Sequence, residues 1–508
     1  MIKHALNSRR AIDFAAWYQE VISQADLAEE SGVRGCMVIK PWGYGIWERI
    51  QKLMDIEIKA AGVENCYFPL FIPLSYFEKE ADHVDGFAKE MAVVTHHRLI
   101  QHDGKLVPDP EAKLEEPLVV RPTSETVIGA AMARWIQSWR DLPMLTNQWA
   151  NVVRWEMRTR MFLRTSEFLW QEGHTAHADK AGALEETLRA LEMYRAFAQG
   201  PLAMPVVAGE KPENERFPGA DATYSIEAMM QDGKALQAGT SHYLGTTFAE
   251  AAGIRYQDKD GNHSLCHTAS WGVSTRLIGG VIMTHGDDDG LRLPPQIAPQ
   301  QIVIVPMLRE DDGDVAVLDY CRTLASDLRA QSAFGEPLRV LLDSKAIKSQ
   351  TKRWNWVKKG APIIVEVGPR DVAEGKAAVI ERVNLYKDDG KLNTQFMVRS
   401  DFVAAAAQMI EQCQARLFDE AKARLEQNIH RNVTDLAKHF KGDEKKFAGW
   451  VEVQWARPTG AALDKVVQQL KTLKITMRNS PIGSAPVDGV CFFTGAKAVE
   501  RILIGRTY

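Results

Sequence analysis

The chain has 508 residues and a formal net charge of −4; 45% of its residues are hydrophobic and 25% are charged. This length predicts about two to four domains. The slightly acidic balance excludes a protein that binds nucleic acid through bulk positive charge, so RNA contacts would need local basic patches. No apolar run approaches the ~18 residues of a membrane helix, and the six scattered cysteines form no CxxC pair. We therefore expect a cytoplasmic protein without a disulfide framework.

The first clear elements are a helix and a strand near the N-terminus. Apolar residues recur at helical spacing over 46–61, and Gly62 is a suitable stop. The run 63–73 is rich in strand-forming residues but contains Pro69 and Pro73. Because proline removes a ladder donor, we expect this strand at the edge of a sheet or at an interface.

The middle of the chain has the texture of an α+β protein. A helix is predicted over 125–139, with Thr123 or Ser124 as its N-cap. Strand-like runs then recur from about 145 to 285, and one long helical pattern, 181–199, lies among them. We expect an antiparallel sheet with few helices on one face.

The last third begins with a Pro-rich segment, 291–300, that is typical of a linker. After it, strands and helices alternate, which predicts a small α/β domain with parallel strands. Residues 401–440 are expected to be largely helical. The alternating strands and helices are predicted over 302–305, 315–331, 338–342, 346–358 and 362–367.

The sequence VVRWEMRTRMFLRTSEFLWQE carries Arg154-x-Glu156 and then Arg164, Phe168 and Glu172 at four-residue intervals. A β-hairpin would present Arg154 and Phe168 towards the same cleft. A planar, permanently charged guanidinium suits a phosphate, and an aromatic face suits an adenine. An isolated Arg-x-Glu is more often a solvated, charged hairpin, but the full pattern is harder to obtain by accident.

A second candidate segment is SWGVSTRLIGG, in which Gly272 precedes Arg276 by four residues. Glycine lets the backbone approach a ligand, and the arginine beside it could meet a terminal phosphate. Alone, this pattern is weak and fits a buried glycine turn better than a ligand site. The chain has no GxxxxGK[ST] motif, so ATP would have to bind in a different architecture.

Taken in order, these segments resemble the three motifs of the class II aminoacyl-tRNA synthetases. The helix 46–61 and the strand through Pro69 are similar to motif 1, the dimer-interface motif. Residues 154–172 resemble motif 2, and residues 272–276 resemble motif 3.

Further segments narrow the resemblance to the prolyl-tRNA synthetases. RPTSET (121–126) and QAGTSHYLG (237–245) look like the amino-acid-recognition segments of that family, and the similarity runs from about residue 14 to 400. The family activates L-proline with ATP to prolyl-adenylate and pyrophosphate, then transfers proline to the 3′ end of tRNA(Pro). Two alternatives stay open: a class II synthetase for threonine, glycine or histidine, and a non-catalytic paralogue. The three phosphate-type arginines, Arg154, Arg164 and Arg276, favour catalysis.

The resemblance implies three domains. Residues 1–290 would form the α+β catalytic domain with the antiparallel sheet of the class II fold, and residues 291–400 an α/β anticodon-binding domain. Residues 401–508 would form a mixed α/β domain that resembles a zinc-binding domain. Structural zinc needs four close ligands, yet Cys491 is the only cysteine after Cys413, so we expect no zinc there.

The resemblance also assigns roles to single residues, with Arg154, Glu156 and Arg276 as the catalytic set. A carboxylate and a hydroxyl would satisfy the two donors of the prolyl ammonium group. The proline-binding residues would be Thr123, Glu125, Arg154, Trp170, Glu172, Phe217 and His242. ATP with Mg²⁺ would be bound by Arg154, Glu156, Arg164, Phe168, Gln237, Thr240, Ser274 and Arg276.

The remaining expectations concern subtype and partners. Only 99 residues separate Glu172 from Gly272, which leaves no room for an editing domain and indicates the eukaryote/archaeon-like type. We expect a homodimer through motif 1 and a loop, 87–91, that closes over the pocket. Anticodon bases would be read by stacking and edge hydrogen bonds, first by Glu366 and Arg370, with further surfaces and cations from Lys348, Lys352, Arg353, Trp354 and Trp356.

Overall fold

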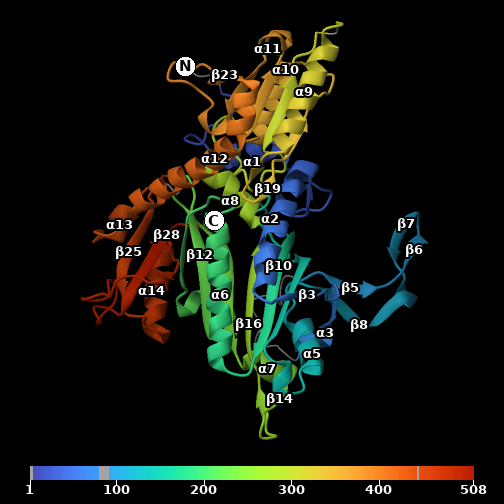
Figure 1. Ribbon diagram of the computed structural model, residues 1–508. Helices are drawn as coiled ribbons and strands as arrows, with labels where there is room; N and C mark the ends of the chain where they lie inside the picture. The colour runs from blue at the N-terminus through green and yellow to red at the C-terminus, as the bar shows by residue number, and fades with distance from the viewer. Residues whose placement is uncertain (1–3, 79–90, 310, 443–445) are drawn as a thin grey trace.

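The computed structural model describes residues 4–78, 91–309, 311–442 and 446–508. Within them, an eight-stranded sheet occupies the middle of the molecule, a five-stranded sheet one end and a four-stranded sheet one side (Figure 1). The loop 87–91 was expected to close over the pocket. Its first four residues lie outside the described part of the chain, and only Met91 is described.

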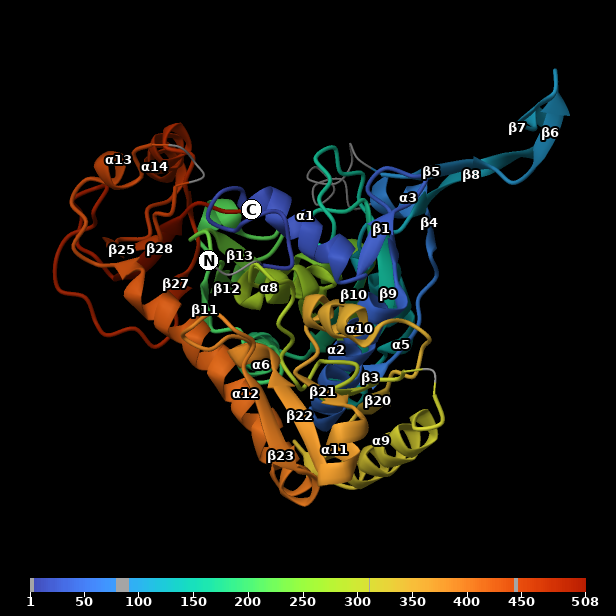
Figure 2. The same ribbon diagram turned by 90° about the horizontal axis from the view of Figure 1, so that it is seen from above.

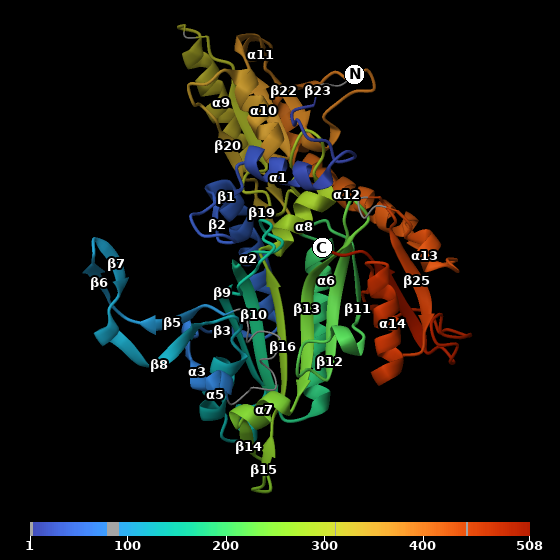
Figure 3. The same cartoon turned by 180° about the vertical axis from the view of Figure 1, so that it is seen from behind.

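The central sheet is antiparallel throughout except at one edge, where β3 runs parallel to β9. The expected α+β plan is therefore confirmed. The long helix α6 (Lys180–Gln199) lies across one face of this sheet (Figures 1 and 3). In spatial order the strands are β27 (Ser480–Pro481), β11 (Val206–Glu210), β12 (Ala222–Met229), β13 (Ala235–Gly245), β16 (His267–Ser274), β10 (Glu167–His177), β9 (Met144–Val153) and β3 (Glu64–Asn65).

The two faces of this sheet have different tasks because side chains alternate along a strand. Gln171 of β10 points towards α6 and accepts a hydrogen bond from the Tyr194 hydroxyl at 2.5 Å. Trp271 of β16 packs edge-on against the same tyrosine. The neighbouring residues of both strands therefore face the other side, which α6 leaves open.

The helices around this sheet agree with the expected pattern, with shifted ends. The motif 1 helix α2 runs from Pro41 to Ala60 and starts earlier than expected because Pro41 occupies its first turn. The helix α5 (Glu125–Trp135) ends before 139, where a 3₁₀ turn, η2 (Trp139–Asp141), follows. The other helices here are α1 (Phe14–Gln24), α3 (Leu74–Glu78), α7 (Thr247–Ala252) and α8 (Arg276–His285).

The Pro-broken run is two short strands instead of one. β3 lies at the edge of the central sheet, as expected, whereas β4 (Phe71–Pro73) joins a separate three-stranded sheet with β8 (Lys113–Val120) and β5 (Val93–His96). A hairpin of β6 (Leu99–His102) and β7 (Lys105–Pro108) extends from it, well away from the body of the molecule (Figure 2).

The five-stranded sheet is mixed. Its first three strands are parallel to one another, as expected, whereas the fourth is antiparallel to the third and the fifth is antiparallel to the fourth. The strands are, in spatial order, β20 (Val340–Leu342), β17 (Ile302–Pro306), β21 (Ile363–Val367), β22 (Lys376–Glu381) and β23 (Thr394–Val398). The accompanying helices are α9 (Asp314–Arg329), α10 (Ser349–Lys359) and α11 (Pro369–Glu374).

The long helix α12 (Arg399–Gln427) leads from this sheet to the four-stranded one (Figure 1). Residues 401–440 are largely helical, as expected, but His430 lies in strand β24 and not in a helix. The strands of the last sheet are β24 (Ile429–His430), β25 (Trp450–Trp455), β28 (Glu500–Gly505) and β26 (Thr476–Met477), with helices α13 (Leu436–His439) and α14 (Gly460–Thr472).

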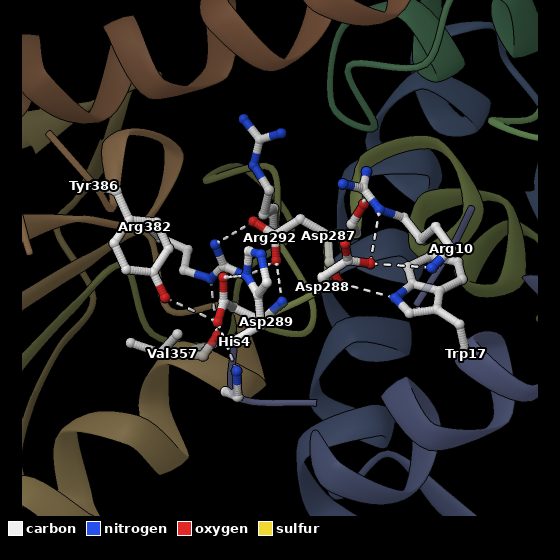
Figure 4. Close-up of polar contacts among 12 residues, drawn as sticks. His4, Arg10, Trp17, Asp287, Asp288, Asp289, Arg292, Val357, Arg382 and Tyr386 are labelled. Atoms are coloured by element: carbon white, nitrogen blue, oxygen red, sulfur yellow. Dashed lines mark hydrogen bonds and ion pairs between the residues drawn. The ribbon is translucent and has the colours of Figure 1, made fainter. Parts of the chain in front are cut away.

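Three consecutive aspartates after α8 tie distant parts of the chain together (Figure 4). Asp287 pairs with Arg382, which follows β22 of the five-stranded sheet; Nη1 lies 2.7 Å from Oδ2. Asp288 accepts from the Arg10 side chain and backbone. Asp289 accepts from His4, Ala5 and Tyr386.

Smaller two-stranded pairs complete the described structure: β1 (Ala28–Glu30) with β2 (Met37–Ile39), β14 (Arg255–Gln257) with β15 (His263–Leu265), and β18 (Ser332–Ala333) with β19 (Glu336–Pro337). Among the described residues, no helix has both the length and the apolar character needed to cross a membrane.

Candidate active site

Two adjoining cavities open on the face of the central sheet opposite α6. The inner cavity has a volume of about 250 Å³ and lies over β10, β13 and β16. The outer cavity has a volume of about 460 Å³ and is bordered by the loop between β9 and β10 and by the C-terminus. Six residues line both: Arg154, Phe168, Glu215, Gln237, Ser274 and Arg276.

The residues expected to bind small substrates all lie on these cavities. Glu156 and Arg164 line only the outer cavity. The others line the inner one: Thr123, Glu125, Arg154, Phe168, Trp170, Glu172, Phe217, Gln237, Thr240, His242, Ser274 and Arg276.

Strand register explains how residues far apart in sequence converge. Trp170 pairs with Ser274, and Glu172 with Gly272, across the β10–β16 ladder. Gly272 also pairs with Thr240 of β13. A Cβ on this glycine would lie 3.1 Å from a backbone oxygen and 3.6 Å from the Trp170 ring, so a side chain there would crowd the cavity.

One end of the inner cavity is polar and acidic. Glu125 is the first residue of α5, and its carboxylate accepts a hydrogen bond from the Thr123 hydroxyl. The residue between them, Ser124, occupies the N-cap position but makes no capping hydrogen bond with its side chain. Its hydroxyl instead donates to Glu172 at 2.5 Å, so the expected side-chain cap is absent at both Thr123 and Ser124.

Glu172 organises this end of the cavity from below. Oε1 accepts hydrogen bonds from Ser124 and from Gln148, both at 2.5 Å, and Oε2 pairs with His174 at 2.8 Å. Burial acts to raise the pKa of this carboxyl, but His174 and the two neutral donors outweigh it and hold the pKa below its ordinary value. Both carboxylate oxygens are thus already engaged, and the residue fixes the turn that presents Thr123 and Glu125.

The same pair makes a testable contribution to stability. The pKa of His174 is raised: burial opposes the charge, but Glu172 outweighs it. A raised folded-state pKa stabilises fully below about pH 6.5, the unfolded value, and this contribution is lost as pH rises through the folded pKa. The stability that the lowered pKa of Glu172 contributes is lost only at acid pH, so it does not change above about pH 6.5. We expect thermal stability to fall as pH rises above about 6.5, and His174→Gln to flatten that slope; equal slopes in both proteins would contradict this.

Aromatic rings form the opposite wall. Phe217 packs on His242 with ring centroids 4.8 Å apart. The Thr223 hydroxyl lies 3.1 Å from Nδ1 of His242 and also accepts from the Phe217 backbone amide. Burial, with Lys211 and other cations nearby, lowers the pKa of His242 to about 3, so this imidazole is neutral at physiological pH and adds no charge to the wall.

The outer cavity is cationic. Arg276 is the first residue of α8, and its Nε donates to the Leu163 carbonyl at 3.2 Å. Arg164 donates to the carbonyl of the C-terminal Tyr508 at 3.1 Å. Burial, together with Arg164 and Arg154, lowers the pKa of Arg276 to about 10, so it stays charged at neutral pH. Several guanidiniums around one cavity suit a polyanion such as a triphosphate.

Several lining residues had no signal in the sequence. Lys211, Thr223 and Ser270 line the inner cavity, and Arg478 lines the outer one from the far end of the chain. Ser270 Oγ and Trp170 Nε1 are buried without a hydrogen-bond partner among the described residues. Only the strand period could have indicated Ser270, which is two residues before Gly272 in β16.

Of the residues expected to read an anticodon, the structure buries some and exposes others. Glu366 is nearly buried in β21 and pairs with Arg353 at 2.9 Å. Arg370 is exposed at the start of α11. Two supporting expectations are wrong: Trp356 is buried and donates to Asp343, and the buried Lys352 ammonium donates to two backbone carbonyls.

The chain is similar in sequence to known families and proteins. Residues 109–285 match the family model described as the tRNA synthetase class II core domain (G, H, P, S and T), and residues 301–405 match an anticodon binding domain. The chain is 76% identical to the proline–tRNA ligase of Sphingopyxis alaskensis, over all of this chain and 96% of that protein. It is 71% identical to that of Novosphingobium aromaticivorans, over 100% and 99%.

Solved structures agree with the sequence relatives. Two crystal structures of the prolyl-tRNA synthetase from Cryptosporidium parvum superpose with a TM-score of 0.86, and each comparison covers 99% of this chain and 97% of the other. One contains halofuginone and AMPPNP at 33% identity, and the other contains L-proline and AMP at 34% identity.

Proposed function

The chain belongs to the class II proline–tRNA ligases, and from that premise we propose that its two cavities divide the substrates, with L-proline in the inner cavity and ATP in the outer one. The reaction is ATP-dependent activation of proline followed by its transfer to tRNA. The observation that carries the division is that the Glu125 carboxylate and the Thr123 hydroxyl lie at one end and the guanidiniums at the other, with Arg154 lining both cavities.

Recognition of proline rests on the acidic end. The prolyl ammonium group has two N–H donors, and Glu125 and Thr123 supply a carboxylate and a hydroxyl beside each other. The apolar ring then lies against Trp170, Phe217 and the neutral His242. A primary-amine substrate would have one donor more than this pair accommodates, and a larger side chain would meet the aromatic wall.

Activation follows from the way Arg154 joins the cavities. An oxygen of the proline carboxylate attacks the α-phosphorus of ATP; the new P–O bond forms as the bond to pyrophosphate breaks. Arg154 stabilises the charge on the α-phosphoryl oxygens, and Arg276 and Arg164 that on the leaving pyrophosphate. The terminal ribose hydroxyl of the tRNA then attacks the prolyl carbonyl; the ester bond forms as the bond to AMP breaks, AMP leaves with the electron pair, and the hydroxyl proton is released. Most of the acceleration comes from positioning.

A magnesium ion fits the outer cavity. Mg²⁺ in nucleotide sites takes one or two protein carboxylates and substrate phosphates, and Glu156 and Glu215 are the carboxylates that line this cavity. When bound there, the ion would neutralise phosphate charge.

The proline assignment predicts a selective effect of Glu125→Gln. The variant keeps the size of the side chain, but it removes the negative charge that meets the ammonium group and replaces one acceptor oxygen with an NH2 donor. We expect KM for proline in pyrophosphate exchange to rise roughly tenfold to hundredfold, the worth of a hydrogen bond to a charged group, while KM for ATP stays within about twofold.

A matched control exists elsewhere on the same domain. Glu250 accepts a hydrogen bond from Thr246 at the start of α7, outside both cavities. Glu250→Gln should leave both KM values unchanged. If Glu125→Gln behaves like Glu250→Gln, or changes KM for ATP instead, the proline assignment fails.

We further propose the type without an editing domain. Supporting this, residues 180–265 are used by α6, β11 to β13, α7, β14 and β15, and most of these elements belong to or pack on the central sheet. The named relatives at 76% and 71% identity are bacterial, so a likeness to eukaryotic and archaeal enzymes would describe architecture and not origin.

The domain division at 290 and 400 is likewise proposed, supported by a separate sheet in each part. The last part would fold without zinc, since Trp455 and Cys491 lie together in one apolar cluster. Glu366 and Arg370 remain the proposed anticodon contacts. All six cysteines are free, which supports a reducing compartment and therefore the cytoplasm.

A homodimer through motif 1 is proposed from exposed apolar surface. Ile56 of α2 and the neighbouring Tyr67 and Phe71 are exposed, as are Leu99 and Leu106 on the extended hairpin. Large apolar side chains gathered on one side of a molecule mark protein interfaces. A second copy that covers α2 and β4 would bury Ile56, Tyr67 and Phe71.

A further inference from the structure

A buried ion cluster lies behind the two cavities. The Glu227 carboxylate in β12 is fully buried. Its Oε2 accepts from Arg478 Nη2 at 2.9 Å and from Nε at 3.2 Å. Its Oε1 lies 3.7 Å from Lys211 Nζ and accepts from the Ser225 hydroxyl at 3.0 Å.

The two cations of this cluster reach different cavities. Lys211 follows β11 and lines the inner cavity, whereas Arg478 lines the outer one. Between them, Gln237 pairs with Glu227 across the β12–β13 ladder and lines both cavities. Glu227 therefore stands behind the point where the cavities join.

Arg478 comes from the C-terminal part of the chain. The next residue, Asn479, donates to backbone carbonyls of β11 and β12, and β27 extends the central sheet beyond β11 (Figure 2). The Arg478 guanidinium also donates to Thr476 at 2.9 Å. Its position on the cavity wall thus depends on docking of the C-terminal part against the catalytic sheet.

The position of Arg478 favours an active role for this cluster. Glu227 faces two buried cations, and Glu215 lies 3.9 Å from the Lys211 ammonium, so the formal charges of the group balance. Burial opposes ionisation of Glu227, but Arg478 and Lys211 outweigh it and lower its pKa. Arg478 is also close enough to Arg276 to help lower the pKa of that guanidinium. A pair that only fastened the two parts would not need to lie on a cavity wall, whereas Arg478 lines the outer cavity together with Arg276.

We propose that Glu227 and Arg478 are positioning residues of the active site, through which the C-terminal part of the chain adds a guanidinium to the ATP cavity. Glu227 holds Arg478 towards the phosphates and Lys211 towards the amino-acid side. This inference rests on the assignment of the outer cavity to ATP. The alternative role is a clamp that only fastens the C-terminal part to the sheet.

The test is a set of substitutions at Arg478, measured by pyrophosphate exchange and thermal unfolding. Arg478→Gln should raise KM for ATP roughly tenfold or more, while KM for proline changes by less than about threefold. Arg478→Lys keeps the charge and should restore part of the ATP affinity. Wild-type KM for ATP in the folded Arg478→Gln protein would overturn the proposal.

A second variant covers the case in which Arg478→Gln leaves Glu227 without its nearer counter-charge and the protein does not fold. Glu227→Gln with Arg478→Gln removes both charges, which relieves that penalty. We expect it to unfold cooperatively but to keep the raised KM for ATP. Recovery of the wild-type KM in this double variant would show that the arginine acts only as a clamp.

The matched control is Arg457, another arginine of the C-terminal part that reaches the same sheet. It pairs with Glu210 at 2.9 Å but lines neither cavity. Arg457→Gln should lower thermal stability without changing KM for ATP. If it raises KM for ATP as much as Arg478→Gln does, both arginines act only by fastening the C-terminal part to the sheet.

Failure of the cavity assignment itself would look different. Arg276→Ala, measured in parallel, must also raise KM for ATP or lower kcat if the outer cavity takes ATP. If Arg276→Ala has no effect, the assignment fails; if it has one and Arg478→Gln does not, only the present inference fails.

Discussion

Replacing Arg154 with alanine is expected to lower kcat/KM for proline-dependent pyrophosphate exchange by about 10²–10³-fold, the effect of losing one group that stabilises a transition-state oxyanion. The guanidinium is held in advance of the reaction. Its Nε donates to the Pro122 carbonyl at 2.8 Å, and the group lies 5.6 Å and 5.4 Å from the ring centroids of Phe168 and Trp170. A cation fixed in this way needs little reorganisation when charge develops on the α-phosphate.

The loss should fall mainly on kcat, because charge on the phosphoryl oxygens grows in the transition state. Arg154→Lys is the informative comparison. It keeps the charge but has no planar fork for the Pro122 carbonyl and a phosphate at once, so we expect partial activity. Adenylate formation at near wild-type rate in Arg154→Ala would remove this residue from the chemistry.

The largest expected effect on stability is that of Arg382→Met. Arg382 is fully buried, and it donates to both oxygens of Asp287 and to the Val357 carbonyl at 2.9 Å. Removing it leaves the aspartate without its main counter-charge at the junction in Figure 4. Breaking a buried pair on one side typically costs about 3–5 kcal/mol. We expect a lower midpoint in urea unfolding followed by circular dichroism.

Asp287 follows α8, the helix that begins at Arg276. A shift of Asp287 would therefore move the helix that positions Arg276 in the outer cavity. Arg399→Met provides the comparison, since its pair with Asp327 joins partly exposed side chains of the same five-stranded unit. Exposed pairs contribute about 0–1 kcal/mol. Similar losses from both substitutions would contradict a special contribution from the buried pair.

Local pattern predicted much of the fold. The strand-like runs expected from about residue 145 onwards include β9 and β10, and the helical pattern of 181–199 corresponds to α6. Expectations failed where another part of the chain decides. The helix α5 stops at Trp135, His430 is recruited to β24, and Lys352 and Trp356 are buried by Asp343 and its neighbours.

The candidate site divides in the same way. By itself, the sequence determined the class, because motifs 2 and 3 are short segments that carry the resemblance to the family. The site residues predicted from that resemblance line the two cavities. Only the tertiary structure decided that Glu227 meets Arg478, 251 residues further along the chain, and that Asp287 meets Arg382. A buried charge is stable only beside its partner, and no local pattern states which distant residue that will be.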